Sequence, residues 1–343
     1  MKNLTVILCL TIAVLLGSGR MSESADFRKG YTAYKSGDYA TVLREWTPLA
    51  EQGDAEAQYN LGLMYDTGEG VAQNYKMAVK WYMLAAEQGY VVAQFNLGSM
   101  YDKGEGVLQD YKTAVEWYSL AARQGHDSAQ TNLGNLYSNG TGVLQDYKTA
   151  GNWWKLAAEQ GSADAQFNLG LMCEKVEVIS YNSETAVKWY TLAAEQGHDL
   201  AQTNLGLIYH EGKGVSQSYI TAVKWYTLAA EQGDAIAQYN LGFMYDKGKG
   251  VKQNYKSAVK WWKLAAEQGY SAAQYNLSAM YQEGQGVIQD NVFAHMWSSI
   301  AATSGDKDAT KNRDIVAKRM TSSQLETAQK LARECVRKKY KGC

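Results

Sequence analysis

Glycine recurs every 36 residues along most of this 343-residue chain. The recurring glycines are Gly53, Gly89, Gly125, Gly161, Gly197, Gly233, Gly269 and Gly305. A fixed period of this length is typical of solenoids, in which one repeat cannot bury its apolar face alone and must stack on its neighbours. The period divides residues 54–305 into seven units: 54–89, 90–125, 126–161, 162–197, 198–233, 234–269 and 270–305.

Each unit carries two stretches of helical periodicity with a glycine-containing loop between them. In the first unit, Ala57 and Leu61 share one helix face, and Trp81 and Leu84 share another. Gly68-Glu69-Gly70 lies between them, where glycine can adopt the positive φ that ends a helix. A residue of N-capping type precedes the second stretch of every unit: Asn74, Asp110, Asp146, Asn182, Ser218, Asn254 and Asp290. The pattern predicts an all-helical solenoid of seven helix-turn-helix repeats.

Three positions recur nearly unchanged and are predicted to hold the helices together. Gly62 recurs as glycine until Ser278, and its missing side chain should let a neighbouring helix approach closely. Gln58 recurs in all units, and we interpret it as structural. The recurring tryptophans are predicted to be core residues: Trp81, Trp117, Trp153, Trp189, Trp225, Trp261 and Trp297.

Helical caps are predicted at both ends of the repeats. Residues 26–53 should form an opening hairpin, with Pro48 kinking its second helix. Residues 306–343 should form a C-terminal helical cap, in which Ser323 to Glu326 has the spacing of a capping box. The basic residues 337–339 suit the C-terminus of a helix, although a basic tail that binds an acidic partner is an alternative.

The first 25 residues have the pattern of a secretory signal peptide. Lys2 is followed by an apolar run from Leu4 to Leu16 and then by small residues. This run is shorter than the roughly 18 residues that a membrane-spanning helix needs. We therefore expect residues 1–25 to be removed, and the mature chain to be periplasmic or secreted without a membrane span.

Composition and cysteine content exclude several other classes of protein. The chain has 34 basic and 35 acidic residues, which leaves no electrostatic footprint for nucleic acid. Three cysteines remain after removal of the signal peptide, too few for a disulfide framework. Cys335 and Cys343 pair if the tail folds back, and otherwise remain unpaired thiols.

The string Ala57 to Gly62, the Gly68-x-Gly70-Val71 loop and the run Trp81 to Ala86 resemble the Sel-one-like repeat family. These proteins are solenoid relatives of tetratricopeptide repeats, and the resemblance covers residues 26–305. It implies a right-handed superhelix whose first helices line a concave groove for protein partners. It also implies a monomeric scaffold or adaptor without catalysis or cofactor, in a family whose bacterial members are commonly exported.

Two neighbouring positions on the first helix of each unit are candidate binding positions. The residues equivalent to Tyr59 vary while the opposite face stays constant, which indicates a face released from common packing. The asparagine that follows offers two donors and an acceptor for the backbone of an extended peptide. Alternatively, these asparagines bond the adjacent repeat. The candidate contact residues are Tyr59, Asn60, Phe95, Asn96, Asn132, Phe167, Asn168, Tyr239, Asn240 and Tyr275.

One enzymatic alternative follows from the resemblance, because cysteine-rich relatives have been linked to β-lactam binding. Ser257 to Lys260 matches the serine-x-x-lysine pattern of β-lactam enzymes. Met77 and Thr221 occupy the slot of Ser257 in other units, so the match is one variant of a scaffold position. The histidines are too far apart along the repeats to share a zinc ion.

A non-catalytic alternative is an envelope scaffold that uses its edges and convex surfaces instead of the groove. The loop at residues 176–181 is relevant here, because it replaces the Gly-x-Gly-Val pattern of the other units. Simple drift and a specialised surface loop both explain that departure.

Overall fold

The computed structural model describes residues 25–175 and 183–343, and every regular element in these ranges is an α-helix. The prediction of an all-helical chain is confirmed for them. Nearly all of the predicted signal peptide, residues 1–25, and the divergent loop at 176–181 lie outside the described residues. The chain forms two compact units, a first unit that ends at Gln109 and a second unit from Asp110 to Cys343.

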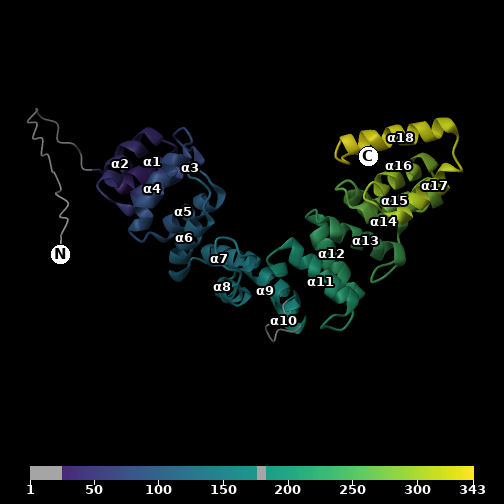
Figure 1. Cartoon of the computed structure of the whole chain (residues 1–343), viewed down its shortest axis with the longest axis horizontal. Helices are drawn as coiled ribbons and strands as arrows, with labels where there is room; N and C mark the ends of the chain where they lie inside the picture. The colour runs from purple at the N-terminus through teal and green to yellow at the C-terminus, as the bar shows by residue number, and fades with distance from the viewer. Residues whose placement is uncertain (1–24, 176–182) are drawn as a thin grey trace, which may run out of the picture. The chain divides into compact units, whose positions relative to one another are not determined.

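The first unit contains α1 (Phe27–Ser36), α2 (Tyr39–Glu51), α3 (Ala55–Thr67), α4 (Tyr75–Glu87) and α5 (Val91–Lys103). Each of these helices packs against the next one in the chain (Figure 1). The predicted N-terminal cap consists of α1 and α2. Pro48 lies inside α2, which continues as one helix to Glu51.

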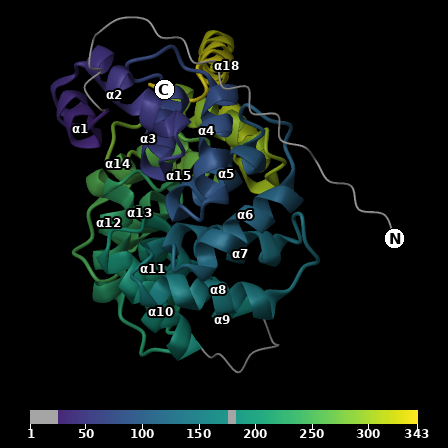
Figure 2. The ribbon, with the colours of Figure 1, turned by 90° about the vertical axis from the view of Figure 1, so that its left-hand side faces the viewer.

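The second unit contains the remaining helices. They are α6 (Tyr111–Arg123), α7 (Asp127–Asn139), α8 (Tyr147–Glu159), α9 (Ala163–Lys175), α10 (Ser183–Glu195), α11 (Asp199–Glu211), α12 (Tyr219–Glu231), α13 (Ala235–Lys247), α14 (Tyr255–Ala266), α15 (Ser271–Glu283), α16 (Asn291–Ala302), α17 (Lys307–Ala317) and α18 (Ser322–Arg337). Figure 2 shows α10, α12 and α14 in one row and α11, α13 and α15 in the adjacent row. First helices and second helices of the repeats therefore form separate layers.

Side-chain caps begin the second helices, as predicted. The Asn74 side chain accepts a hydrogen bond from the Met77 N–H at 3.2 Å. The Asp146 carboxylate accepts from the N–H groups of Lys148 and Thr149. Six of the seven predicted caps are confirmed in this way: Asn74, Asp110, Asp146, Ser218, Asn254 and Asp290. Asn182 lies outside the described residues.

The two glycines of each loop have different tasks. Gly104 ends α5 with a φ of 75° and donates its N–H to the Met100 carbonyl. Gly106 also has a positive φ, and a Cβ there would lie 2.4 Å from the Tyr75 carbonyl oxygen at the start of α4. The second glycine thus lets the loop contact the backbone of the preceding repeat.

The glycine inside the first helix allows the close approach that we predicted. A Cβ on Gly206 would lie 2.4 Å from the ring of Tyr226 on α12. The last repeat is an exception to this pairing. There, Ser278 replaces the glycine and Ser298 replaces the aromatic residue. Both serine hydroxyls donate to the Ala294 carbonyl, at 2.6 and 2.9 Å.

Buried glutamines tie each first helix to the helix before it. Gln166 Nε2 donates to the Ala158 carbonyl at 3.1 Å, and its Oε1 accepts from Gln196 Nε2 at 2.8 Å. The carbonyl contact occurs in every repeat, made by Gln58, Gln94, Gln130, Gln166, Gln202, Gln238 and Gln274. The structural interpretation of this series is confirmed, because burial of an unpaired amide would be costly.

The C-terminal cap consists of α17 and α18, and α18 packs against α16. Our capping-box prediction at Ser323 to Glu326 is wrong, because α18 begins earlier. Thr321 is the N-cap, and its hydroxyl and backbone N–H exchange hydrogen bonds with Gln324. This pair has the same spacing two residues upstream, and it places the capping side chain next to the first turn.

A disulfide joins Cys335 and Cys343, whose Cα atoms are 5.6 Å apart. The pairing depends on a reversal of the chain after α18 ends at Arg337. Lys339 and Tyr340 have positive φ values of 52° and 65°, and the Tyr340 N–H donates to the Cys335 carbonyl. Of the two alternatives for these cysteines, the structure has the one in which the tail folds back.

Candidate functional site

The predicted contact residues all lie on first helices, and all ten side chains are half-buried. In the first unit they are Tyr59 and Asn60 on α3 and Phe95 and Asn96 on α5. In the second unit they are Asn132 on α7, Phe167 and Asn168 on α9, Tyr239 and Asn240 on α13, and Tyr275 on α15. Each unit therefore presents a row of partly accessible aromatic and amide groups along its first-helix layer.

The variable position in this row is matched to the residue that precedes the next first helix. Tyr59 packs against Tyr90 with tilted rings whose centroids are 5.1 Å apart, and Phe167 stacks on His198 at 4.5 Å. Tyr239 contacts Tyr270 in the same way at 5.0 Å. Rings are thus paired with rings from one repeat to the next.

Where threonine occupies this position, its partner is a hydrogen-bonding group instead. Thr131 Oγ1 lies 3.1 Å from Ser162 Oγ, and Thr203 donates to the Asp234 carboxylate at 2.9 Å. The residues at this position change together with their neighbours. This position therefore has no contact common to all units, and it packs pairwise against the neighbouring repeat while its side chains stay partly accessible.

The asparagine row makes two kinds of contact. Asn60 and Asn240 each donate to a carbonyl of their own helix, four residues earlier. Asn96 lies close to the Tyr59 and Tyr82 hydroxyls of the preceding repeat, and Asn168 donates to Asn135 Oδ1 at 2.9 Å. The alternative that these residues bond the adjacent repeat therefore holds for Asn168, and not for Asn60 and Asn240.

A buried tyrosine hydroxyl connects this row to the end of the first helix. Tyr82 OH donates to the Asp66 carboxylate at 3.1 Å, and Tyr190 OH donates to Glu174 at 2.7 Å. Burial, followed by the nearby carboxylate, raises the pKa of both tyrosines. The hydroxyls therefore stay protonated and act as structural donors, which is a role that we did not predict.

The tryptophan series is not uniformly buried, so its prediction as core is wrong for part of it. Trp81, Trp225 and Trp297 are buried, whereas Trp117, Trp153, Trp189 and Trp261 are half-buried. A lysine one residue earlier covers some of these rings, with Lys80 and Lys260 Nζ 5.2 and 4.8 Å from the ring centroids of their neighbours. Whether this tryptophan is buried depends on which residues cover the second helix, and the periodicity of the sequence does not reveal them.

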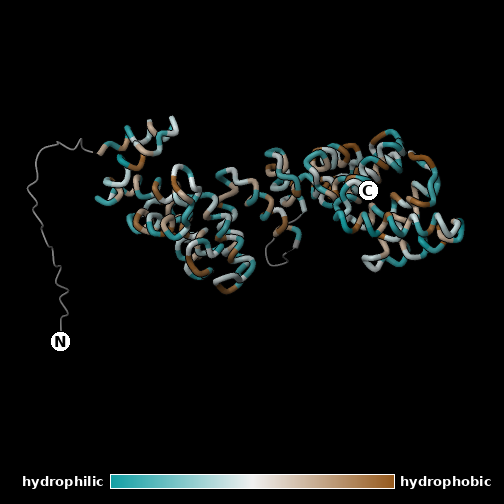
Figure 3. Tube along the Cα trace, turned by 90° about the horizontal axis from the view of Figure 1, so that it is seen from above, coloured by the Kyte–Doolittle hydropathy of each residue, from teal (hydrophilic) through white to brown (hydrophobic). Residues whose placement is uncertain are grey.

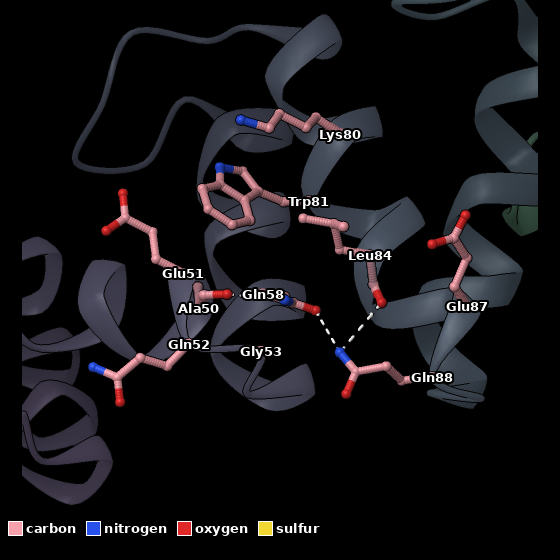
Figure 4. Close-up of a pocket in the computed structure, with 10 residues that line it drawn as sticks. All are labelled: Ala50, Glu51, Gln52, Gly53, Gln58, Lys80, Trp81, Leu84, Glu87 and Gln88. Carbon is pink, nitrogen blue, oxygen red and sulfur yellow. Dashed lines mark hydrogen bonds between the residues drawn. The ribbon is translucent and has the colours of Figure 1, made fainter. Parts of the chain in front are cut away.

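A groove of about 540 Å³ lies beside the second helix α4 in the first unit (Figure 4). Residues 50–53 at the end of α2 form one side, and Lys80, Trp81, Leu84 and Glu87 line the other. The ten predicted contact residues do not line it. The signal for this groove is the leucine that recurs three residues after each of the first six tryptophans; we placed Leu84 on a packed face, but it is 37% exposed.

Neither the β-lactam pattern nor the histidines assemble into a chemical site in the described residues. The Ser257 N–H donates to the cap Asn254, and Lys260 extends over the Trp261 ring instead of toward Ser257. His126 and His198 cap α7 and α11 through Nδ1. Across residues 25–175 and 183–343, no three His, Cys, Asp or Glu side chains come together as metal ligands.

None of the described helices is both long and apolar enough to span a membrane. Figure 3 shows hydrophobic and hydrophilic positions alternating along the helices of each unit. This is the pattern of helices that bury one face and leave the other in contact with water.

The family model of the Sel1 repeat matches the chain seven times, one residue downstream of the predicted units. The matched ranges are 55–90, 91–126, 127–162, 163–198, 199–234, 235–270 and 271–306. The chain belongs to the Sel1 repeat family. Each matched range contains a helical hairpin of the observed type, from α3 and α4 to α15 and α16.

Solved structures include two similar Sel1-type proteins. A Sel1 repeat protein from Oxalobacter formigenes is 34% identical, with a TM-score of 0.63 over 71% of this chain and 99% of its own. A protective antigen of uropathogenic Escherichia coli with this fold is 33% identical, with a TM-score of 0.44 over 90% of this chain and 83% of its own.

An immunity protein from Pseudomonas aeruginosa is 23% identical, with a TM-score of 0.37 over 62% of this chain and 81% of its own. No curated protein matches the chain. The comparisons thus establish the repeat and its fold, and they identify no ligand.

Proposed function

We propose that this Sel1 repeat protein is a non-catalytic interaction scaffold that binds a protein or an extended peptide across its first helices. The observation that carries the proposal is the row of half-buried aromatic and asparagine side chains along the first-helix layer of each unit. Solenoids use such repeated surfaces to contact partners over several repeats. The proposal includes no cofactor, no metal and no nucleic acid, and it treats the chain as a monomer.

Unused hydrogen-bonding groups in the row support this choice. In the described structure, Asn132 and Asn276 make no side-chain hydrogen bond, and Asn240 bonds only to its own helix. A peptide backbone offers the N–H and C=O groups that such amides bind. Leu200 on α11 and Ile236 on α13 are 43% and 41% exposed, so apolar side chains of a partner have a place to bind on these first helices.

We also propose that the chain works outside the cytoplasm, in the periplasm or as a secreted protein. The disulfide between Cys335 and Cys343 supports this, because such bonds persist mainly in oxidising compartments. The signal-like pattern of residues 1–25 points in the same direction.

A scaffold that uses its edges is the second candidate, and the loops provide its support. Leu144 and Ile288, at equivalent loop positions of the second unit, are 91% and 89% exposed. These side chains would offer a partner apolar contacts at the loop edge, one repeat after another.

Crosslinking mass spectrometry on residues 26–343 with envelope extract and host secretions tests the proposal. The matched variant changes Asn132, Asn240 and Asn276 to alanine, which breaks no bond between repeats, and circular dichroism confirms that it is folded. A partner captured by the parent and lost by this variant supports the first-helix site. Equal capture by both, together with loss on changing Leu144 and Ile288 to serine, moves the site to the loop edge.

A further inference from the structure

The second helices of the second unit carry a row of exposed leucines that ends abruptly at the last repeat. Each leucine lies three residues after the recurring tryptophan, and between 37% and 45% of its surface is exposed. The row consists of Leu120, Leu156, Leu192, Leu228 and Leu264. The next equivalent residue is Ile300, and it is only 2% exposed.

The helix α18 accounts for that difference. It packs against α16 at the end of the second unit (Figure 1). Trp297, Ile300 and Cys335 belong to one buried cluster, with Leu331 and Ala332 packed against it. None of the other second helices in the described structure is covered by a helix in this manner. The same second-helix surface is therefore covered in the last repeat, by α18, and exposed in the earlier repeats of this unit.

The grooves beside the second helices of the two units share two positions of the repeat in their linings. Between α16 and α18 lies a groove of about 380 Å³ that includes Ile300 and Thr303 on one side and Arg333 on the other. Leu84 and Glu87 occupy the positions of Ile300 and Thr303 in the groove of the first unit. The register of α18 on α16 thus shows how a helix fits beside the recurring leucine.

Charge indicates which kind of helix suits the open copies. Arg333 of α18 shares its groove with Thr303, but the equivalents of Thr303 in the middle repeats are glutamates. These are Glu159, Glu195, Glu231 and Glu267. Lys155 and Lys263 lie 3.9 and 3.7 Å from Glu159 and Glu267 on their own helices, whereas Glu195 and Glu231 form no ion pair in the described structure. A basic side chain at the position of Arg333 would meet a carboxylate in each of these repeats.

We propose that this second-helix face, defined by Leu156, Leu192, Leu228 and Leu264 with their glutamates, docks a basic amphipathic helix of a partner protein. The helix binds as α18 binds α16. Small apolar residues at the spacing of Ala328, Ala332 and Cys335 pack around the leucine of one repeat, and a flanking basic residue contacts the glutamate of that repeat. This surface is distinct from the first-helix row, and its occupation does not depend on that site.

The probe is a synthetic peptide of residues 319–341 with Cys335→Ser, held helical by a lactam between Glu326 and Lys330. Both bridged residues are exposed on α18, so the apolar stripe stays available. Fluorescence anisotropy with the full chain should show saturable binding. Leu228→Asp with Leu264→Asp should weaken it about tenfold, and Glu231→Gln with Glu267→Gln about threefold with a smaller salt dependence.

The matched control is Leu144→Asp, which changes an even more exposed leucine outside this face and should leave binding unchanged. Absence of binding by the helical probe overturns the proposal. Binding that is insensitive to the Leu228 and Leu264 changes also overturns it, including the case in which the peptide replaces the chain's own α18. Equal weakening by Leu144→Asp would show nonspecific apolar contact and would overturn it as well.

Discussion

The two helices of each repeat pack together through pairs of residues that match in size, one on each helix. A glycine on the first helix faces an aromatic ring on the second, as Gly206 faces Tyr226, whereas the last repeat has serine at both positions. The two positions change together, so that neither repeat places a side chain of the first helix against an aromatic ring of the second. Close-packed interiors tolerate such exchanges when both members change, and they resist the change of one member alone.

Gly206→Ser should therefore destabilise the protein by about 1–3 kcal/mol, because the ring of Tyr226 occupies the space of the new side chain. Adding Tyr226→Ser should cost less than the sum of the two single changes, since it recreates the pair at Ser278 and Ser298. Urea unfolding of the three variants measures this coupling. Strict additivity would show that the two positions do not share their space.

The buried glutamines provide a second prediction at this scale. Gln166→Met keeps the volume but removes the hydrogen bonds to the Ala158 carbonyl and from Gln196 Nε2, which retain their bonds to the Gly161 N–H and the Leu192 carbonyl. The loss should be about 1–2 kcal/mol, the typical net contribution of one or two hydrogen bonds. Glu159→Gln, a change on an exposed side chain of the same junction, serves as the control and should have little effect in the same unfolding assay.

Helices and their boundaries were largely predictable, since the signals that set them are local. Caps such as Asn74 and Asp146 act within three residues of their own position. The pairing of Phe167 with His198 spans two repeats and appears only when neighbouring columns of the repeat are compared. The docking of α18 on α16 could not be predicted, because the apolar periodicity of α18 does not show which helix it packs against.

The disulfide should stabilise the attachment of α18. It closes a short loop at the end of that helix, and loops of this size gain roughly 2–3 kcal/mol from closure. Reduction, or Cys335→Ala with Cys343→Ala, should lower the midpoint of thermal unfolding and increase hydrogen exchange in α18 before the other helices. Cys173→Ala distinguishes this effect from a general loss of thiols, and identical exchange in α18 with and without the disulfide would refute it.

At the scale of the whole molecule, buried histidines make stability depend on pH. Burial lowers the pKa of His126, His210 and His295, assisted at the last two by Lys249 and Arg313 respectively. The unfolded chain therefore binds these protons at a higher pH than the folded chain does. Stability is fully present above about pH 6.5 and is lost as the pH falls toward the folded pKa values.

Unfolding midpoints measured between pH 7.5 and 5 should show this decrease. His126→Asp should reduce it, because aspartate caps the equivalent helix α13 at Asp234 and remains charged through this range. A midpoint that rises on acidification, or an unchanged slope in the variant, would contradict the role given to these histidines.

The central claim, that the first-helix row binds a protein partner, is tested most directly by photo-crosslinking in cells that produce the protein. A benzophenone side chain replaces Tyr239 in the row, and in a matched variant it replaces the exposed loop residue Leu144. The account predicts a discrete protein adduct from position 239 and none from position 144. An adduct from position 144 alone would contradict it and place the contact at the loop edge.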